Sequence, residues 1–122
     1  MRITVCILCI ALAQAIAAGT TLRGWLSDEA CARGRATSGV FTGTNPDCAK
    51  RCVSEGKKIV FIDPDGKRVL DIANQDAARN HIGDYVEVVG FVDAKTNALR
   101  VDSLKFISEG AAACSRPPSK TK

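Results

Sequence analysis

The sequence predicts a single, mainly β domain whose five strands close into a barrel, with one short helix between the third and fourth strands. Three observations lead to this fold class. Short apolar runs separated by turn signals recur from residue 21 to residue 107, as in a chain of antiparallel strands. One helical pattern interrupts them after the third run. The length of 122 residues, 46% hydrophobic and 25% charged, is that of one globular domain and excludes a multidomain enzyme.

The first residues are predicted to be an export signal. Arg2 is the only charge before Arg23, an apolar run follows it, and residues 15–18 form an Ala-x-Ala cleavage pattern. These features are typical of a secretory signal peptide, here residues 1–17. A membrane anchor is the alternative, but a spanning helix needs about 20 strongly apolar residues. We therefore expect a periplasmic or secreted protein with no stable membrane insertion after cleavage.

The first two strands differ in their pattern. Residues 21–27 place Leu22 and Leu26 on one face, and Gly24 favours a bend or bulge. Residues 57–63 are apolar on both faces, which predicts a central strand that is buried on both sides.

The third strand and the helix follow a strong turn signal, Pro-Asp-Gly at residues 64–66. The strand covers residues 67–72, with Leu70 and Ile72 facing inward. Asn74 is then expected to cap a short helix over residues 75–82, which Gly83 ends.

The last two strands form a hairpin around the loop at residues 93–97. Residues 84–92 alternate, so that one face carries Val86, Val88 and Val92. Residues 98–107 begin with Leu99 and Val101 inward and then change phase to Leu104 and Phe106. This change predicts a bulge near residues 102–103.

The order strand–strand–strand–helix–strand–strand, with a bent first strand, is that of an OB-fold, a partly open five-stranded Greek-key barrel. A flat antiparallel sheet with one helix is the competing architecture. The domain is expected to cover residues 18–107, and residues 108–122 are expected to be a flexible basic C-terminal tail.

The insert between the first two strands, residues 28–56, is far longer than the usual hairpin loop. In an OB-fold this loop and the one between strands four and five border the binding face. Residues 45–56 predict a helix in the insert, with Asn45 as the cap, Pro46 in the first turn and Gly56 at the end.

Four of the six cysteines remain after residues 1–17 are removed, namely Cys31, Cys48, Cys52 and Cys114. Cys48 and Cys52 lie one turn apart on one helix face, which Cys31 can approach. An exported compartment favours paired thiols. The leading interpretation is therefore a structural disulfide from Cys31 to Cys48 or Cys52, worth about 3 kcal/mol.

Two alternatives for these cysteines stay open. Cys31, Cys48 and Cys52 could bind a soft metal, copper or zinc, although their spacing is not a standard zinc pattern and no histidine is near. Cys48, near a helix N-terminus, could serve thiol redox chemistry. Cys114 could pair with whichever thiol of the insert is left over, or remain free for a partner.

The remaining composition argues against catalysis and nucleic-acid binding. Without Arg2 the net charge falls from +4 to +3, and the aromatic residues are too few for a single-strand binding groove. His81 is the only histidine, and no nucleophile or orienting carboxylate is predicted beside it. We expect no catalytic residues and no cofactor. The predicted function is a monomeric, non-enzymatic binding module for an unknown protein or small molecule.

Three segments carry a resemblance to a known family. The sequences are GWLSDEAC at residues 24–31, DCAKRCVSEGK at residues 47–57 and DGK at residues 65–67. Together they resemble a family of small exported bacterial proteins of unknown function. The resemblance covers residues 22–107 and implies an OB-like barrel with a C…C-x3-C motif, but no activity. Family members often carry a histidine between the first two cysteines, and its absence here weakens a metal role.

Overall fold

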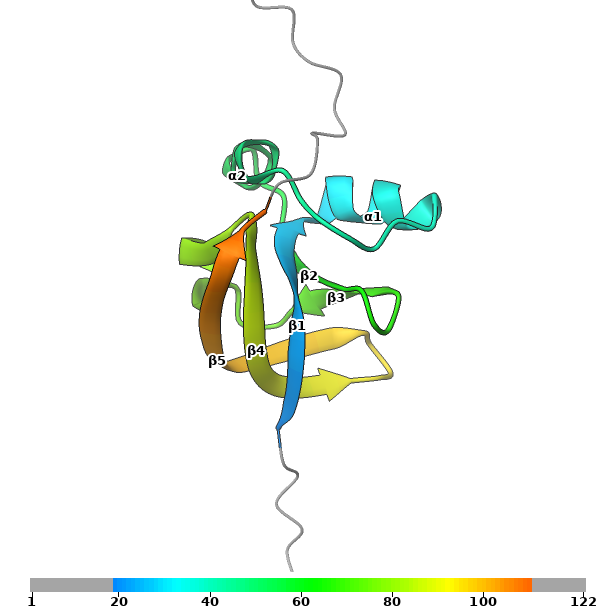
Figure 1. Ribbon diagram of the computed structural model, residues 1–122, viewed down its shortest axis with the longest axis vertical. Helices are drawn as coiled ribbons and strands as arrows, with labels where there is room; N and C mark the ends of the chain where they lie inside the picture. The colour runs from blue at the N-terminus through cyan, green and yellow to red at the C-terminus, as the bar shows by residue number, and fades with distance from the viewer. Residues whose placement is uncertain (1–18, 111–122) are drawn as a thin grey trace, which may run out of the picture.

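The fold is a closed barrel in which each strand is hydrogen-bonded to two neighbours, in the order β1-β2-β3-β5-β4 (Figure 1). The computed structural model describes residues 19–110. All neighbouring strands are antiparallel except β3 and β5, which are parallel. This order confirms the predicted OB-fold-like barrel. The strands are β1 (Thr20–Asp28), β2 (Ile59–Asp63), β3 (Arg68–Ile72), β4 (Asp84–Asp93) and β5 (Ala98–Glu109).

Strand β1 changes partner at the predicted bend. Its first six residues pair with β4 and its last four pair with β2, so that Trp25 pairs with both. At Gly24 a Cβ atom would lie 2.0 Å from the Ile62 carbonyl oxygen and 2.7 Å from Cζ of Phe61. Only a residue without a side chain fits here, and this close approach lets the barrel close.

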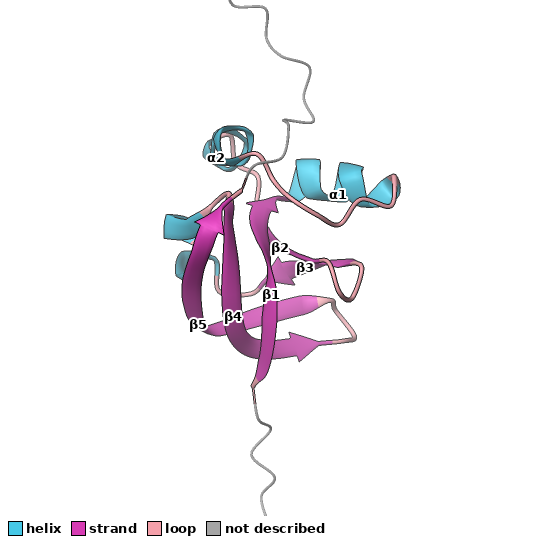
Figure 2. Ribbon diagram, in the orientation of Figure 1, coloured by secondary structure: helices cyan, strands magenta, loops and turns pink. Residues whose placement is uncertain are grey.

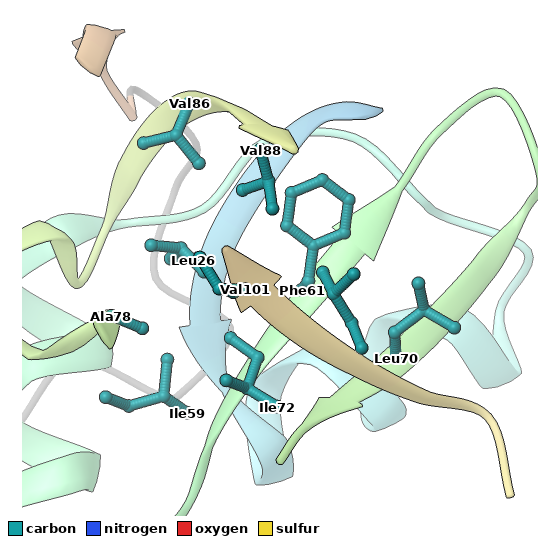
Figure 3. Close-up of a cluster of buried hydrophobic side chains, with 10 residues drawn as sticks. Leu26, Ile59, Phe61, Leu70, Ile72, Ala78, Val86, Val88 and Val101 are labelled. Carbon is teal, nitrogen blue, oxygen red and sulfur yellow. The ribbon is translucent and has the colours of Figure 1, made fainter. Parts of the chain in front are cut away.

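The core fills the inside of the barrel (Figure 3). Its members come from all five strands and confirm most of the predicted inward positions. Leu22, Val92 and Leu104, which were also predicted to face inward, are only partly buried against it. The buried core residues are Leu26, Ile59, Phe61, Leu70, Ile72, Ala78, Val86, Val88, Leu99 and Val101.

Strand β2 is buried along its whole length, as its two apolar faces predict. Val60 and Ile62 point away from the barrel interior and form a second cluster with Ala32 of the insert. Phe41, also from the insert, packs against this cluster. The insert therefore covers the outer face of β2.

The insert contains two helices where the sequence predicts one, α1 (Glu29–Thr37) and α2 (Pro46–Ser54) (Figure 2). The predicted cap at Asn45 is confirmed, and Pro46 occupies the first turn of α2. Helix α1 was not predicted because its apolar residues are mostly alanine and it contains Gly34, a poor helix former. It is stabilised by the contact of Ala32 with β2.

The short helix predicted at residues 75–82 is confirmed in position but is divided in two. Two short 3₁₀ helices stand there, η1 (Gln75–Ala77) and η2 (Arg79–His81). Asn74 makes no side-chain cap. Its amide instead donates to the Val101 carbonyl oxygen at 2.7 Å and accepts from the Val101 N–H at 2.8 Å. Backbone pairing between β3 and β5 covers only two residue pairs, which end at Ile72 and Leu99. The Asn74 side chain continues the hydrogen bonding to β5 beyond them.

Strand β5 shows the predicted bulge and runs beyond the predicted domain end, to Glu109. Val89 pairs with Ser103 and Gly90 with Val101, so Asp102 is the extra residue. Phe106 pairs with Val86 as the predicted phase requires. Its side chain is 49% exposed, however, so the prediction that it is buried is wrong.

Candidate functional site: a cluster of three cysteines

The two helices of the insert begin in the same way. The Asp28 side chain accepts a 2.9 Å hydrogen bond from the Cys31 N–H, and the Asn45 side chain accepts a 2.9 Å bond from the Cys48 N–H. Each cap bonds to the residue three positions later, in the first helical turn. Each cysteine is therefore fixed at the start of a helix, where the exposed N–H groups and the helix dipole favour a negative charge.

The three cysteines of the insert converge. The sulfur atoms of Cys31, Cys48 and Cys52 all lie within 4.8 Å of one another, and those of Cys31 and Cys48 are 3.7 Å apart. Cys48 and Cys52 are buried, whereas Cys31 is partly exposed. The predicted convergence on one point is confirmed. We refer to these residues as the cysteine cluster.

Cys31 forms no disulfide in the structure. A disulfide bond is about 2.05 Å long, so the 3.7 Å between Cys31 and Cys48 is a contact between neighbouring sulfurs. The disulfide from Cys31 to Cys48 or Cys52 stays a prediction. Cys114 lies outside the described residues, as do the predicted signal peptide and most of the predicted tail.

The spacing of the sulfurs matches that of thiolates around one metal ion. With a zinc–sulfur distance of about 2.3 Å, two thiolates of a tetrahedral site lie about 3.8 Å apart, and those of a trigonal site about 4.0 Å. The 3.7 Å contact and the 4.8 Å limit bracket these values. A shift of less than about 1 Å would bring all three sulfurs to ligand distance.

Asp28 is a site residue that the sequence analysis did not single out. Its side chain is buried, and although Oδ2 accepts from the Cys31 N–H, Oδ1 has no hydrogen-bond partner within the described part of the chain. The D-x-x-C spacing, which N-x-x-C repeats at Asn45, is the signal that could have identified it. Asp28 holds the backbone of Cys31 and places a carboxylate next to the start of α1.

The start of α2 is docked onto the barrel by close backbone contacts. Gly83 has φ +90°, a conformation that L side chains rarely adopt, and a Cβ there would lie 2.4 Å from Pro46 Cα. The Gly83 N–H donates to the Leu26 carbonyl at 2.7 Å. Nearby, the buried Thr44 hydroxyl donates to the Ser27 hydroxyl at 2.9 Å. These contacts fix α2, and with it Cys48 and Cys52, relative to β1.

A second feature beside the insert is an open pocket of about 460 Å³. It is lined in part by Trp25 and Tyr85, whose ring centroids are 4.7 Å apart. Arg35 of α1 lines it and donates to the carbonyls of Thr42 and Gly43. The pocket thus lies between the insert and the strands β1, β4 and β5, a juxtaposition that the sequence did not predict.

His81 does have a carboxylate partner, which corrects the sequence analysis. Its Nδ1 lies 3.3 Å from Oδ2 of Asp84, the first residue of β4. The Phe106 ring centroid is 6.4 Å from that of His81. His81 and Asp84 are three residues apart, but they lie in different elements. A helical repeat therefore does not predict their contact. The pair links η2 to β4.

Family models, curated proteins and solved structures were all compared with this chain, and none matches. The family resemblance therefore stays a prediction. Within residues 19–110, no helix has the length and apolar character required to cross a membrane.

Proposed function

We propose that this protein is an exported, non-enzymatic binding module, and that its reduced form binds one soft metal ion, Cu(I) or zinc, through Cys31, Cys48 and Cys52. The observation that carries the proposal is the approach of all three sulfurs to within 4.8 Å of one another. A single structural disulfide needs only two sulfurs. A third one at the same point is what a soft ion requires.

The surroundings of the cluster support a bound cation. Two cysteines are buried, which limits competition from water, and partly exposed Cys31 leaves a path for an ion to enter. Both helix starts carry the positive end of a helix dipole. The first-turn acids Glu29 and Asp47 oppose this effect and compensate the charge of the ion.

The direct test is metal binding to the reduced protein. Residues 18–122 are reduced without oxygen, the reductant is removed, and Zn(II) or Cu(I) is titrated against a chelator of known affinity. Elemental analysis should find one ion per chain. Cys31→Ser, Cys48→Ser and Cys52→Ser should each weaken binding at least about tenfold, since changes to residues that merely support ligands already cost that much.

The matched control is Ser54→Ala, a change at an exposed residue of the same helix as Cys48 and Cys52. It should bind metal like the unaltered protein. If reduced protein retains no stoichiometric metal, or if the three serine variants bind as tightly as Ser54→Ala, the metal function is refuted.

A disulfide-stabilised interaction module is the second candidate, favoured by the gathering of three cysteine sulfurs within 4.8 Å of one another. An oxidising compartment favours paired thiols. Protein isolated from the exported fraction would then be two hydrogens lighter per disulfide by intact mass. Alkylation before and after reduction would identify the cysteines involved.

A further inference from the structure

A row of side chains crosses the outer face of the barrel beside the insert. Trp25 of β1 pairs with Tyr85 of β4, and Tyr85 pairs with Ser108 of β5. Directly paired residues of neighbouring antiparallel strands share one face of the sheet. Trp25 packs against Val60 and Ile62 on the outer face of β2, so the row points away from the core. It forms a surface with two aromatic rings and a hydroxyl group.

The insert stands along one side of this row and turns it into a pocket. Figure 1 shows the segment between α1 and α2 passing the C-terminal end of β1. Arg35 holds this segment to α1 by donating to the carbonyl oxygens of Gly43 at 2.9 Å and Thr42 at 2.6 Å. All three residues line the open pocket, and so does Glu109 at the end of β5. Its volume of about 460 Å³ lies in the range of small-molecule sites, about 300–1,000 Å³.

The charges of the lining favour a neutral ligand. Among the described residues that line the pocket, Arg35 is the one cation and Glu109 the one anion, so the two charges offset each other. The amino groups of Arg35 already donate to two backbone carbonyls. This planar fork is therefore engaged and is not free to hold a carboxylate or phosphate by paired hydrogen bonds. A ligand cation is attracted by aromatic faces, but here it would also meet the positive charge of Arg35.

The shape of the lining favours a ligand with an apolar face and several hydroxyl groups. The Trp25 and Tyr85 rings are tilted by 43° to each other. A flat aromatic ligand can stack on only one of two rings so inclined. The C–H groups of a puckered sugar ring point in several directions and can meet both rings, whose faces carry partial negative charge. Within residues 19–110, the side chains of Thr42, Ser108 and Glu109 make no hydrogen bonds and are left to pair with hydroxyl groups.

We infer that this open pocket binds a short, neutral saccharide. A sugar ring packs its C–H face on Trp25 and Tyr85, and its hydroxyl groups exchange hydrogen bonds with the polar side chains of the lining. OB-folds commonly bind oligosaccharides on the face of strands two and three. Here the insert covers the outer face of β2, and the pocket lies on β1, β4 and β5 instead. The inference goes beyond the proposed metal binding, because none of the described cysteines lines the pocket.

Trp25 gives the pocket its own reporter, because it is the only tryptophan of the chain. Residues 18–122 are titrated with the neutral trisaccharides maltotriose, cellotriose and triacetylchitotriose while the fluorescence of Trp25 is followed. At least one of them should change the emission saturably at millimolar concentration or below. Added salt should leave the affinity unchanged, because a neutral ligand forms no ion pair that salt can screen. Choline and inorganic phosphate are the cationic and anionic comparison probes.

Ser108→Ala tests the hydrogen bonding with little risk to the fold, because Ser108 is exposed. It should weaken trisaccharide binding about twofold to tenfold. Ser103→Ala is the matched control, an exposed serine of the same strand outside the pocket, and should bind like the unaltered protein. Tyr85→Ala removes one ring and should also weaken binding about twofold to tenfold, whereas Tyr85→Phe keeps the ring and should lose less. Circular dichroism checks that each variant is folded.

The outcomes decide this inference separately from the metal function. Saturable binding of a trisaccharide, weakened by Ser108→Ala and not by Ser103→Ala, supports it. No response of Trp25 to any of the trisaccharides, or equal affinities in the two serine variants, would overturn it. Tighter binding of choline or phosphate that is lost at high salt would also overturn it and indicate a charged ligand. Zinc binding by the reduced protein should be the same in Ser108→Ala as in the unaltered protein, so either proposal can fail without the other.

Discussion

Replacing Gly24 with alanine should strongly destabilise the barrel. The added Cβ would lie 2.0 Å from the Ile62 carbonyl oxygen, and the next contact, at 2.7 Å, is with the buried Phe61 ring. The first obstacle is backbone, so no rotamer change can relieve it. Strands β1 and β2 must separate by more than about 1 Å next to Trp25, where β1 changes partner from β4 to β2, since carbon atoms pack at about 3.5 Å or more.

The expected cost follows from the kind of contact. Added methyl groups in a packed core usually cost about 1–3 kcal/mol, and a clash with backbone at a strand junction belongs at the upper end. A loss of about 3 kcal/mol lowers the melting temperature of a domain of this size by about 12–24 °C.

The control is the same substitution at Gly34. This glycine lies inside α1, and a Cβ there would meet nothing within 4 Å. Gly34→Ala should therefore stabilise the protein by about 0.5–1 kcal/mol through helix propensity alone. Urea unfolding of the reduced, metal-free protein, followed by circular dichroism, measures both variants. A loss below about 1 kcal/mol for Gly24→Ala, or a larger loss for Gly34→Ala, would refute the reasoning.

Two further predictions concern buried polar groups and use the same unfolding measurement. Asn74→Ala removes both hydrogen bonds to the buried Val101 backbone and should cost about 2–4 kcal/mol; a loss within about 0.5 kcal/mol would show that water replaces the amide. Arg68→Ala leaves the carboxylate of Asp63, whose side chain is 3% exposed, without its ion-pair partner and should cost about 1–3 kcal/mol. Arg79→Ala breaks a solvent-exposed pair and should change stability by less than about 0.5 kcal/mol; equal effects of the two arginine changes would contradict this account.

Most strands were predictable because strand patterns are local. The valines of β4 alternate with a period of two, and the bulge at Asp102 appears as a change of phase in β5. The 3₁₀ turns after Asn74 were not predictable, because that side chain bonds to Val101, 27 residues away. The local sequence favours a helix cap at Asn74, but its side chain makes hydrogen bonds to Val101 instead.

The candidate site was predictable in part for the same reason. Cys48 and Cys52 share a helix face by spacing alone. The approach of Cys31 depends on the path of residues 32–47, which is set by α1 packing on the outer face of β2. The unpaired oxygen of Asp28 depends on burial, and no sequence pattern reports which of two carboxylate oxygens will find a donor.

The change of partner along β1 also constrains the kinetics of folding. β1 is the first strand to be synthesised, yet Thr20 pairs with Gly90, so one of its edges stays open until most of the chain exists. Pairings over such sequence distances form slowly. Nascent chain that lacks β4 thus has no closed barrel to adopt. For the export that we propose, this delay would leave time for the chain to cross the membrane before it folds.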